Sequence, residues 1–269
     1  MKKLISVLLT LMMVVALFAA CSTTKDVSND TKTEDVDDFS YITENKKLVI
    51  GMTDYAPMNY KDENGEWTGF DTEFALAVCE KLGVEAEFVE IDWDNKFVAL
   101  KSKAIDCIWN GMTISDEVLK NTSCSKAYVK NAQVAILNKD VAAKIENVED
   151  MADLTFAVEA GSAGAQAAAD NNLNYIEAQT QTDALLEVKS GSTDGCVIDL
   201  TMAKAVIENE GSSYKDLAIA YELTSEEYGI AFRQGSNLLE KVEAIMDELK
   251  ADGTLDKLAQ KYELVLSEN

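Results

Sequence analysis

The sequence of 269 residues contains no histidine. The Ser-His-Asp and Cys-His arrangements of hydrolases and the commonest zinc sites depend on that residue, so its absence excludes them. We predict neither a metal nor a cofactor. Proline and arginine occur once each, as Pro57 and Arg233. The chain therefore has a single arginine, the residue that most often binds carboxylates through two parallel hydrogen bonds.

Basic residues are also scarce. There are 24 Lys and Arg against 48 Asp and Glu, which gives a net charge of −24. Such a chain repels phosphate backbones, so we exclude nucleic acid as a partner. Hydrophobic residues make up 47% of the sequence, and a chain of this length can bury one large core or two modest ones.

The first 21 residues have the pattern of a secretion signal. Lys2 and Lys3 precede an apolar run at 4–20, and Cys21 follows it. The segment LFAAC at 17–21 resembles a bacterial lipobox, although Phe18 stands where leucine is usual. We expect Cys21 to be lipidated and to anchor the protein on the outer face of the cytoplasmic membrane. An uncleaved membrane anchor is the alternative.

The segment after Cys21 and the four later cysteines are read on the assumption that the protein is exported. Residues 22–46 are rich in Ser, Thr and Asp, and we predict a flexible tether there. The remaining cysteines lack the spacing of a disulfide framework or a metal site. We expect mostly free thiols, with one Cys107–Cys124 bridge as the alternative, because export permits disulfides.

From residue 47 onward, short apolar segments alternate with helical patterns. This alternation is typical of parallel sheets covered by helices. The predicted strands are 47–52, 86–91, 106–109, 132–137, 155–160, 174–178, 195–199, 217–222 and 228–232. The predicted helices are 71–83, 95–103, 163–171, 181–191, 201–209, 237–253 and 255–262. The pattern repeats after a polar connector, so we predict two α/β lobes that share one cleft.

Aromatic residues follow two of the predicted strands. Tyr55 comes after the strand at 47–52, in a loop held by Pro57, and Trp93 follows the strand at 86–91. Ligands of open α/β sheets bind beyond the carboxyl ends of the strands. Two rings there could enclose a flat or cationic ligand, although each ring alone would equally suit a core.

Glycine and hydroxyl residues follow two other strands. Gly111 and Thr113 lie between the strand at 106–109 and an acidic helix start, and Ser162 and Ala163 follow the strand at 155–160. Free N–H groups at helix starts bind small anions. Asp199 ends the strand at 195–199, where it could bind an ammonium group or cap the next helix. Ordinary capped helices are the alternative at the other two places.

These segments, in this order, resemble the extracytoplasmic solute-binding proteins of polar amino-acid ABC transporters, of the bacterial family 3 type. The resemblance covers residues 47–264, and its most specific parts are YAPMNYKDENGEWTGFDTEFALAV (55–78), IDCIWNGMTIS (105–115), EEYGIAFRQG (226–235) and LKADGTLDKLAQKY (249–262). It implies two Rossmann-like lobes of the periplasmic-binding-protein type II, joined by a hinge that closes on the ligand. The implied division is lobe 1 at 47–136, lobe 2 at 137–224 and a return to lobe 1 at 225–269.

The resemblance also implies the ligand contacts. Tyr55 and Trp93 match flanking aromatic positions, Asn110 to Thr113 match a ligand turn, and Ser162 and Ala163 match a helix start that meets an α-carboxylate. Asp199 matches the acid that pairs with the α-ammonium group. The expected contacts are Tyr55, Trp93, Asn110, Gly111, Met112, Thr113, Lys130, Ser162, Ala163 and Asp199.

One position departs from the pattern. Many relatives end the segment at 112–118 in an arginine that binds the α-carboxylate, and here the residue is Val118. Because a buried carboxylate without a cation is costly, three interpretations follow. Lys130 supplies the charge, the backbone N–H groups of both helix starts carry it, or the ligand is not an ordinary α-amino acid. A solvated surface lysine is the alternative for Lys130.

The leading functional hypothesis is capture of an amino acid or similar zwitterion by a monomer that delivers it to an ABC permease, without catalysis. A sensory protein reporting to a membrane receptor is the second possibility. An enzyme resembling cyclohexadienyl dehydratases is the third, with Asp54, Glu159 and Asp199 available for acid–base work. Its substrates carry two carboxylates, whereas this cleft has at most one evident cation.

Overall fold

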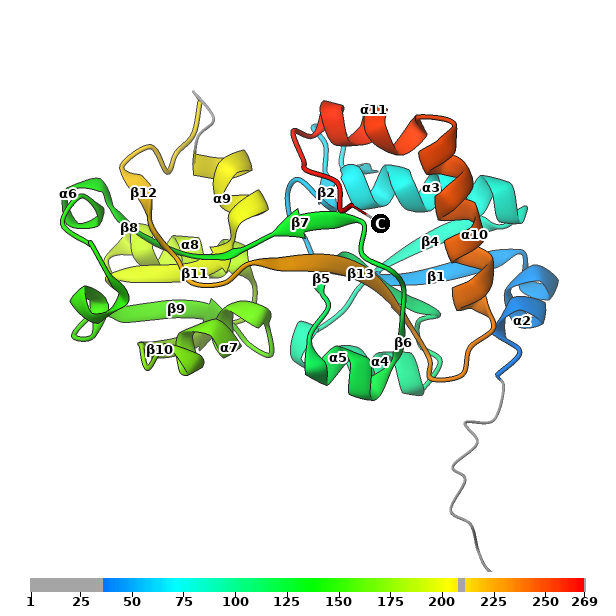
Figure 1. Cartoon of the computed structure of the whole chain (residues 1–269), viewed down its shortest axis with the longest axis horizontal. Coiled ribbons are helices and arrows are strands. Elements are labelled where there is room, and N and C mark those ends of the chain that lie inside the picture. The colour runs from blue at the N-terminus through cyan, green and yellow to red at the C-terminus, as the bar shows by residue number, and fades with distance from the viewer. Residues whose placement is uncertain (1–35, 208–210, 269) are drawn as a thin grey trace, which may run out of the picture. The chain divides into compact units, whose positions relative to one another are not determined.

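The computed structural model describes residues 36–207 and 211–268, which belong to one compact unit at 34–269. They form two α/β lobes, each built around its own sheet (Figure 1). We call residues 38–131 and 226–268 lobe 1, and residues 133–222 lobe 2. The predicted signal segment with Cys21, and the tether as far as residue 35, lie outside the described residues.

The sheet of lobe 1 has strand order β4-β1-β5-β13-β6, and β7 pairs with the end of β13. Strand β1 runs parallel to β4 and β5, whereas β13 is antiparallel to β5. The strands are β1 (Lys47–Met52), β4 (Glu85–Glu90), β5 (Cys107–Thr113), β6 (Ser123–Cys124), β7 (Val129–Asn131) and β13 (Glu226–Phe232). A hairpin of β2 (Tyr60–Lys61) and β3 (Trp67–Thr68) lies outside this sheet.

The helices of lobe 1 cover this sheet and bury its apolar residues. They are α2 (Asp38–Asn45), α3 (Phe70–Leu82), α4 (Lys96–Lys101), α5 (Asp116–Asn121), α10 (Leu238–Ala251) and α11 (Thr254–Lys261), with a 3-10 turn at Trp93–Asn95 before α4. Helix α3 ends at Gly83, whose left-handed conformation (φ 71°) lets its N–H close the last turn. Phe74 of α3 packs edge-to-face on the fully buried Trp109 of β5, with ring centroids 4.9 Å apart.

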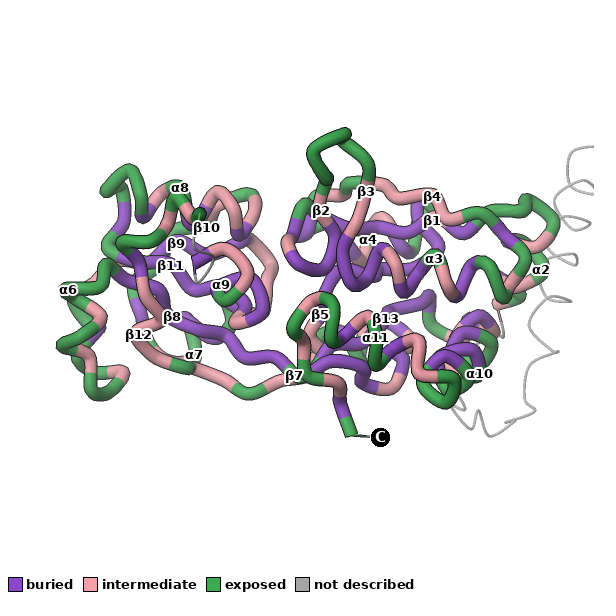
Figure 2. The backbone as a smooth tube through the Cα atoms, turned by 90° about the horizontal axis from the view of Figure 1, so that it is seen from above, coloured by how far each residue is buried: buried purple, intermediate pink, exposed green. Residues whose placement is uncertain are grey.

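The sheet of lobe 2 has strand order β10-β9-β11-β8-β12. Strands β9 (Thr155–Glu159), β10 (Asn174–Ala178) and β11 (Gly195–Asp199) are parallel, and β8 (Gln133–Asn138) runs antiparallel to β11 and β12 (Leu217–Glu222). The helices are α6 (Lys139–Ala142), α7 (Ala163–Asp170), α8 (Gln181–Ser190) and α9 (Leu200–Ile207), with a 3-10 turn at Val148–Met151. Burial concentrates in the central strands of both sheets, such as β5 and β11, whereas the edge strand β10 is largely exposed (Figure 2).

The chain crosses between the lobes twice, from β7 to β8 and from β12 to β13. The first crossing corrects the boundary that we placed after residue 136. Strand β8 pairs with β11 along its whole length, so lobe 2 begins at Gln133. The apolar pattern at 132–137 identified a strand but could not say which sheet it joins, because both sheets accept a buried strand.

Helix α2 corrects the predicted tether, which extended to residue 46. Ile42 is fully buried, and the helix packs on β1 and α10. Arg233 explains the docking: its Nε donates to Asp38 at 2.9 Å and its Nη2 to Asp106 at 3.0 Å. Because the partner of Asp38 lies 195 residues further on, local composition did not reveal this helix.

Two smaller points follow from the described residues. Cys79, Cys107, Cys124 and Cys196 are free, so the alternative of a Cys107–Cys124 bridge is wrong. No helix within 36–207 and 211–268 is both long and apolar enough to cross a membrane.

Candidate ligand-binding cleft

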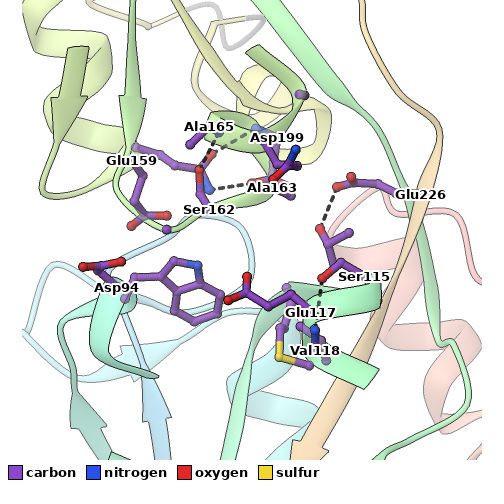
Figure 3. Close-up of a pocket in the computed structure, with 18 of the residues that line it drawn as sticks. Asp94, Ser115, Glu117, Val118, Glu159, Ser162, Ala163, Ala165, Asp199 and Glu226 are labelled. Atoms are coloured by element: carbon purple, nitrogen blue, oxygen red, sulfur yellow. Dashed lines mark hydrogen bonds between the residues drawn. The ribbon is translucent and has the colours of Figure 1, made fainter. Parts of the chain in front are cut away.

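A cleft of about 660 Å³ lies where the carboxyl ends of strands from both lobes face each other. Nine of the ten expected ligand residues line it: Tyr55, Trp93, Asn110, Gly111, Met112, Thr113, Ser162, Ala163 and Asp199. The two-lobed topology thus brings together residues that are up to 144 positions apart, from Tyr55 to Asp199. Figure 3 shows the residues that approach the cleft from the two sides.

The floor of the cleft in lobe 1 is a strand and not the turn that we expected at 110–113. Strand β5 continues to Thr113 because it stays paired with β13, and the register shifts opposite Gly111. Gly111 has φ 53°, and a Cβ atom there would lie 2.6 Å from Cε1 of Tyr55. Only glycine combines this left-handed conformation with such a close approach of the ring.

Asp71 stabilises this irregular strand by a hydrogen bond to its backbone, and the sequence did not single this residue out. Its buried Oδ2 accepts hydrogen bonds from the Gly111 N–H (2.6 Å) and from the Tyr128 hydroxyl (3.0 Å). Burial raises the pKa of Asp71 to about 7, and these two hydrogen bonds act against that rise. A carboxyl group in the first turn of α3 therefore positions the backbone that borders the cleft.

Asn110 and Thr113 are already engaged with the protein. Asn110 Nδ2 donates to Thr53 at 2.7 Å, and Thr113 Oγ1 donates to Glu226 at 2.8 Å. Ser115 caps α5, accepting from the Val118 N–H at 3.3 Å. Ser115 is therefore an ordinary helix cap, as in the alternative considered, and it also lines the cleft.

The Tyr55 hydroxyl connects the two lobes. It shares hydrogen bonds of 2.5 Å with Thr201 at the start of α9 and with Tyr228 on β13. Tyr55 is among the residues that line the cleft and is only 2% exposed, so we take its ring as one wall. Trp93 is the other wall, fixed by Asp92, which accepts the N–H of Asp94 at the start of the 3-10 turn.

In lobe 2, helix α7 points its first turn at the cleft. Gly161 (φ 67°) turns the chain after β9, and Ser162 Oγ then accepts the Ala165 N–H at 3.1 Å (Figure 3). Ser162 and Ala163 both line the cleft, so the first N–H groups of α7 are placed to meet an anionic group.

Asp199 is held by side chains from both crossing strands. Its Oδ1 accepts from Gln133 (2.9 Å), Asn131 (2.5 Å) and Tyr228 (2.7 Å). It does not cap α9, because the Thr201 N–H donates to Asn131 instead. Burial, followed by the nearby Glu226, raises the pKa of Asp199 to about 7.

Glu226 shares the donors of Asp199. Its Oε1 accepts from Thr113 in lobe 1 and from Asn131 and Gln133 on the first crossing. Asp199, Glu226 and the two crossings thus form one hydrogen-bonded cluster that borders the cleft. Sequence reasoning missed Glu226, and its position in the specific segment at 226–235 was the available signal.

Lys130 was expected in the cleft, and the structure contradicts this. Side chains alternate along β7, where Val129 and Asn131 are buried and Lys130 is exposed. Asn131 therefore faces the hydrogen-bonded cluster, while Lys130 points to the other side and pairs with Glu268 at 3.2 Å. Lys130 is a surface lysine, as in the alternative considered.

The cation that does line the cleft is Lys96, which follows Trp93 by three residues. Among the described lining residues it is the sole cation, against eight acids. These acids are Asp94, Asp116, Glu117, Glu159, Asp170, Glu177, Asp199 and Glu226. Asp54 is not among them, so the set proposed for acid–base work reduces to Glu159 and Asp199.

Glu159 is the most deeply buried of these acids. It is 3% exposed, and burial together with the charge of Asp199 raises its pKa to about 8, which Lys96 partly offsets. No group of three or more His, Cys, Asp or Glu side chains suited to a metal occurs in the described part of the chain. The cleft is therefore an acidic, aromatic-walled pocket with one ammonium group.

Residues 48–265 match the bacterial extracellular solute-binding proteins, family 3. The chain belongs to this family. It is 30% identical over 226 residues to the arginine-binding extracellular protein ArtP of Bacillus subtilis, covering 81% of this chain and 86% of that protein. The two-lobed type II fold expected from the sequence is confirmed.

Two solved structures are similar over most of the chain. One is an ABC uptake transporter substrate-binding protein from Streptococcus pneumoniae with bound histidine, 30% identical, with a TM-score of 0.76 and coverage of 84% and 96%. The other is the ancestral amino-acid-binding protein AncCDT-1, a precursor of cyclohexadienyl dehydratase, 33% identical, with a TM-score of 0.77 and coverage of 84% and 99%.

Proposed function

We propose that this solute-binding protein captures a cationic amino acid outside the cytoplasm and delivers it to an ABC importer. The observation that carries the proposal is the acidic character of the cleft, whose described lining has eight Asp and Glu side chains and one lysine. A cleft of one charge sign concentrates counter-ions and disfavours solutes of its own sign. The relatives with arginine in their name or histidine in their structure support this ligand class.

The arrangement of the groups fits a zwitterion with an additional positive charge. The first turn of α7 offers N–H groups to a carboxylate, and Asp199, on the neighbouring β11 of the same lobe, is available for an ammonium group. Tyr55 and Trp93 supply aromatic faces, which also attract cations. A guanidinium, ammonium or imidazolium side chain would then meet the remaining acids.

Ligand binding should favour closure of the two lobes, because residues of both lobes and of both crossings border the cleft. The bond from Tyr55 to Thr201 joins the lobes, and Glu226 joins both crossings to Thr113. A ligand that contacts both walls stabilises the closed arrangement relative to an open one, which is how hinge closure is driven. The closed form would then dock on the permease.

We infer that the protein makes and breaks no bond in its ligand. The similarity to AncCDT-1 and the raised pKa values of Glu159 and Asp199 are the features that favour an enzyme. Against this, a substrate with two carboxylates would meet only one lysine among the described lining residues. Turnover of prephenate or arogenate, followed by absorbance, would overturn this part of the proposal.

The proposal includes anchorage through a lipid on Cys21, supported by the lipobox-like segment at 17–21. Cys21→Ser should release the protein from the membrane fraction of cells that express the full chain. Loss of ligand uptake on deletion of the gene distinguishes an importer component from a sensor, because a sensor would leave uptake intact.

The ligand class is tested by isothermal calorimetry and thermal shift on the purified protein. L-arginine, L-lysine and L-histidine are compared with L-glutamine and L-glutamate at matched pH. At least one cationic amino acid should raise the melting temperature in a concentration-dependent way, since it binds only the folded state. Binding of L-glutamate or L-glutamine alone would contradict the proposed ligand class.

A further inference from the structure

One buried ammonium group in the cleft lacks a counter-ion. Lys96 is 4% exposed, yet none of the ion pairs between described residues involves it. Buried charges are normally paired, because removal from water is costly. Burial accordingly lowers the pKa of Lys96, although Glu117, Glu159 and Asp94 act in the opposite direction at longer range.

The contacts that Lys96 does make solvate the charge without neutralising it. Its Nζ donates to the Gly161 carbonyl at 2.8 Å and to the Trp93 carbonyl at 3.2 Å. It also lies 5.1 Å from the centre of the Trp93 ring and 4.8 Å from that of Phe97. An ammonium group has three donors, so these two bonds leave one N–H for a ligand.

The ammonium group of Lys96 lies close to the start of α7. It reaches from α4 in lobe 1 to Gly161 in lobe 2, the residue directly before Ser162, which caps α7. The ammonium group and the first turn of α7 therefore adjoin the same region of the cleft from opposite lobes. The other charged groups of the described lining are carboxylates, so a carboxylate of the ligand has one favourable place to bind.

We propose that Lys96 binds the carboxylate of the ligand and so makes the cleft specific for an amino acid over the amine that lacks this carboxylate. The inference rests on the proposed function and deepens it. Val118 cannot supply the charge, because its apolar side chain is 3% exposed and packs in a cluster with Trp93, Leu100 and Met112. Lys96, whose ammonium group lies 5.1 Å from the centre of the Trp93 ring, supplies the charge instead.

A purely mechanical role for Lys96 predicts a different result. The bond to the Gly161 carbonyl alone would hold the lobes together, and its loss would weaken every ligand equally. A carboxylate-binding role weakens only ligands that carry the carboxylate. Pairs of ligands that differ in this single group therefore separate the two roles.

The experiment measures affinities by isothermal calorimetry at one pH for the pairs L-arginine and agmatine, L-lysine and cadaverine, and L-histidine and histamine. For whichever pair binds, the wild-type protein should have an affinity for the amino acid at least about tenfold higher than for the amine. Lys96→Met should lower the affinity for the amino acid by about ten- to hundredfold and leave that for the amine within about twofold. Lys96→Arg should keep the preference.

Lys101→Met is the matched control, because Lys101 is an exposed residue of the same helix that bonds Asn121. It should behave as the wild type does. Equal losses for amine and amino acid in Lys96→Met, or no loss, would overturn the role of Lys96. If Lys96→Met fails to fold, loss of the preference in Lys96→Arg would overturn it.

The outcomes also separate this inference from the proposed function. A wild-type protein that binds none of the six compounds contradicts the proposed function itself. A wild-type protein that binds a cationic amino acid and its amine equally well leaves cationic-solute capture standing and overturns the assignment of Lys96.

Discussion

Glu159 is a carboxyl group for which a proton and a cationic ligand compete. Burial and, after it, the charge of Asp199 on β11 raise its pKa, Lys96 of α4 lowers it, and the resulting pKa is about 8. A hydrogen bond from Gln181 also lowers the pKa, and Asp183 of α8 raises it slightly. Near neutral pH the ligand-free protein therefore carries this group largely protonated.

The direction and size of the pH effect follow from this competition. A cation stabilises the ionised carboxylate, so ligand binding lowers the pKa of Glu159 and releases a proton. Affinity must then rise with pH below about 8. If the pKa in the complex falls well below 6, the Kd for the ligand should drop by about 50-fold between about pH 6 and pH 8.

Isothermal calorimetry with L-arginine, or with whichever cationic amino acid binds, measures this effect at about pH 6, 7 and 8. Two buffers with different ionisation enthalpies count the protons released. Glu159→Gln should reduce the pH dependence, leaving the part due to Asp199, whose pKa of about 7 lies in the same range. An affinity that stays within about twofold over this range, with heats that do not depend on the buffer, would refute the competition.

Four further results are expected. Gly111→Ala should lower the free energy of unfolding by about 1–2 kcal/mol for its φ of 53° alone, and by more for the clash with the facing ring, as measured by urea denaturation. Arg233→Met should cost about 3–5 kcal/mol, because it removes the buried cation of Asp38 and Asp106 and leaves only the exposed Lys103, 3.9 Å from Asp38; a loss below about 1 kcal/mol would contradict this. Lys130→Ala should leave ligand affinity unchanged in calorimetry, since the side chain lies outside the cleft lining. Without ligand, the melting temperature should fall as the pH rises from about 5 to about 8, because carboxyl groups with raised folded pKa values bind more protons in the folded than in the unfolded state; a rise would contradict the burial of these groups.

Local pattern was sufficient for most elements of the fold. Apolar segments and helix caps predicted the longer strands and most helices of both lobes, because burial periodicity and capping depend on neighbours a few residues apart. Helices α2 and α6 and the short strands β2, β3, β6 and β7 were not predicted. The order of the predicted elements also indicated the family, and nine of the ten ligand residues expected from it line the cleft. The excess of acid over base, visible in the composition, extends to the cleft itself.

Other features depended on contacts between distant residues. Helix α2 needs Arg233, and the assignment of β8 to lobe 2 needs its pairing with β11. These partners are not visible in a local window of sequence.

The choice between the two lysines is the clearest case. By itself, the sequence determined that an arginine is missing at Val118 and that a lysine was a candidate to replace it. Only the tertiary structure decided which lysine faces the cleft. The alternation of β7 turns Lys130 outward, whereas the turn after Trp93 brings Lys96 against Gly161 of the other lobe. The direction of a side chain relative to a second lobe is set by packing across the whole molecule, which no short segment encodes.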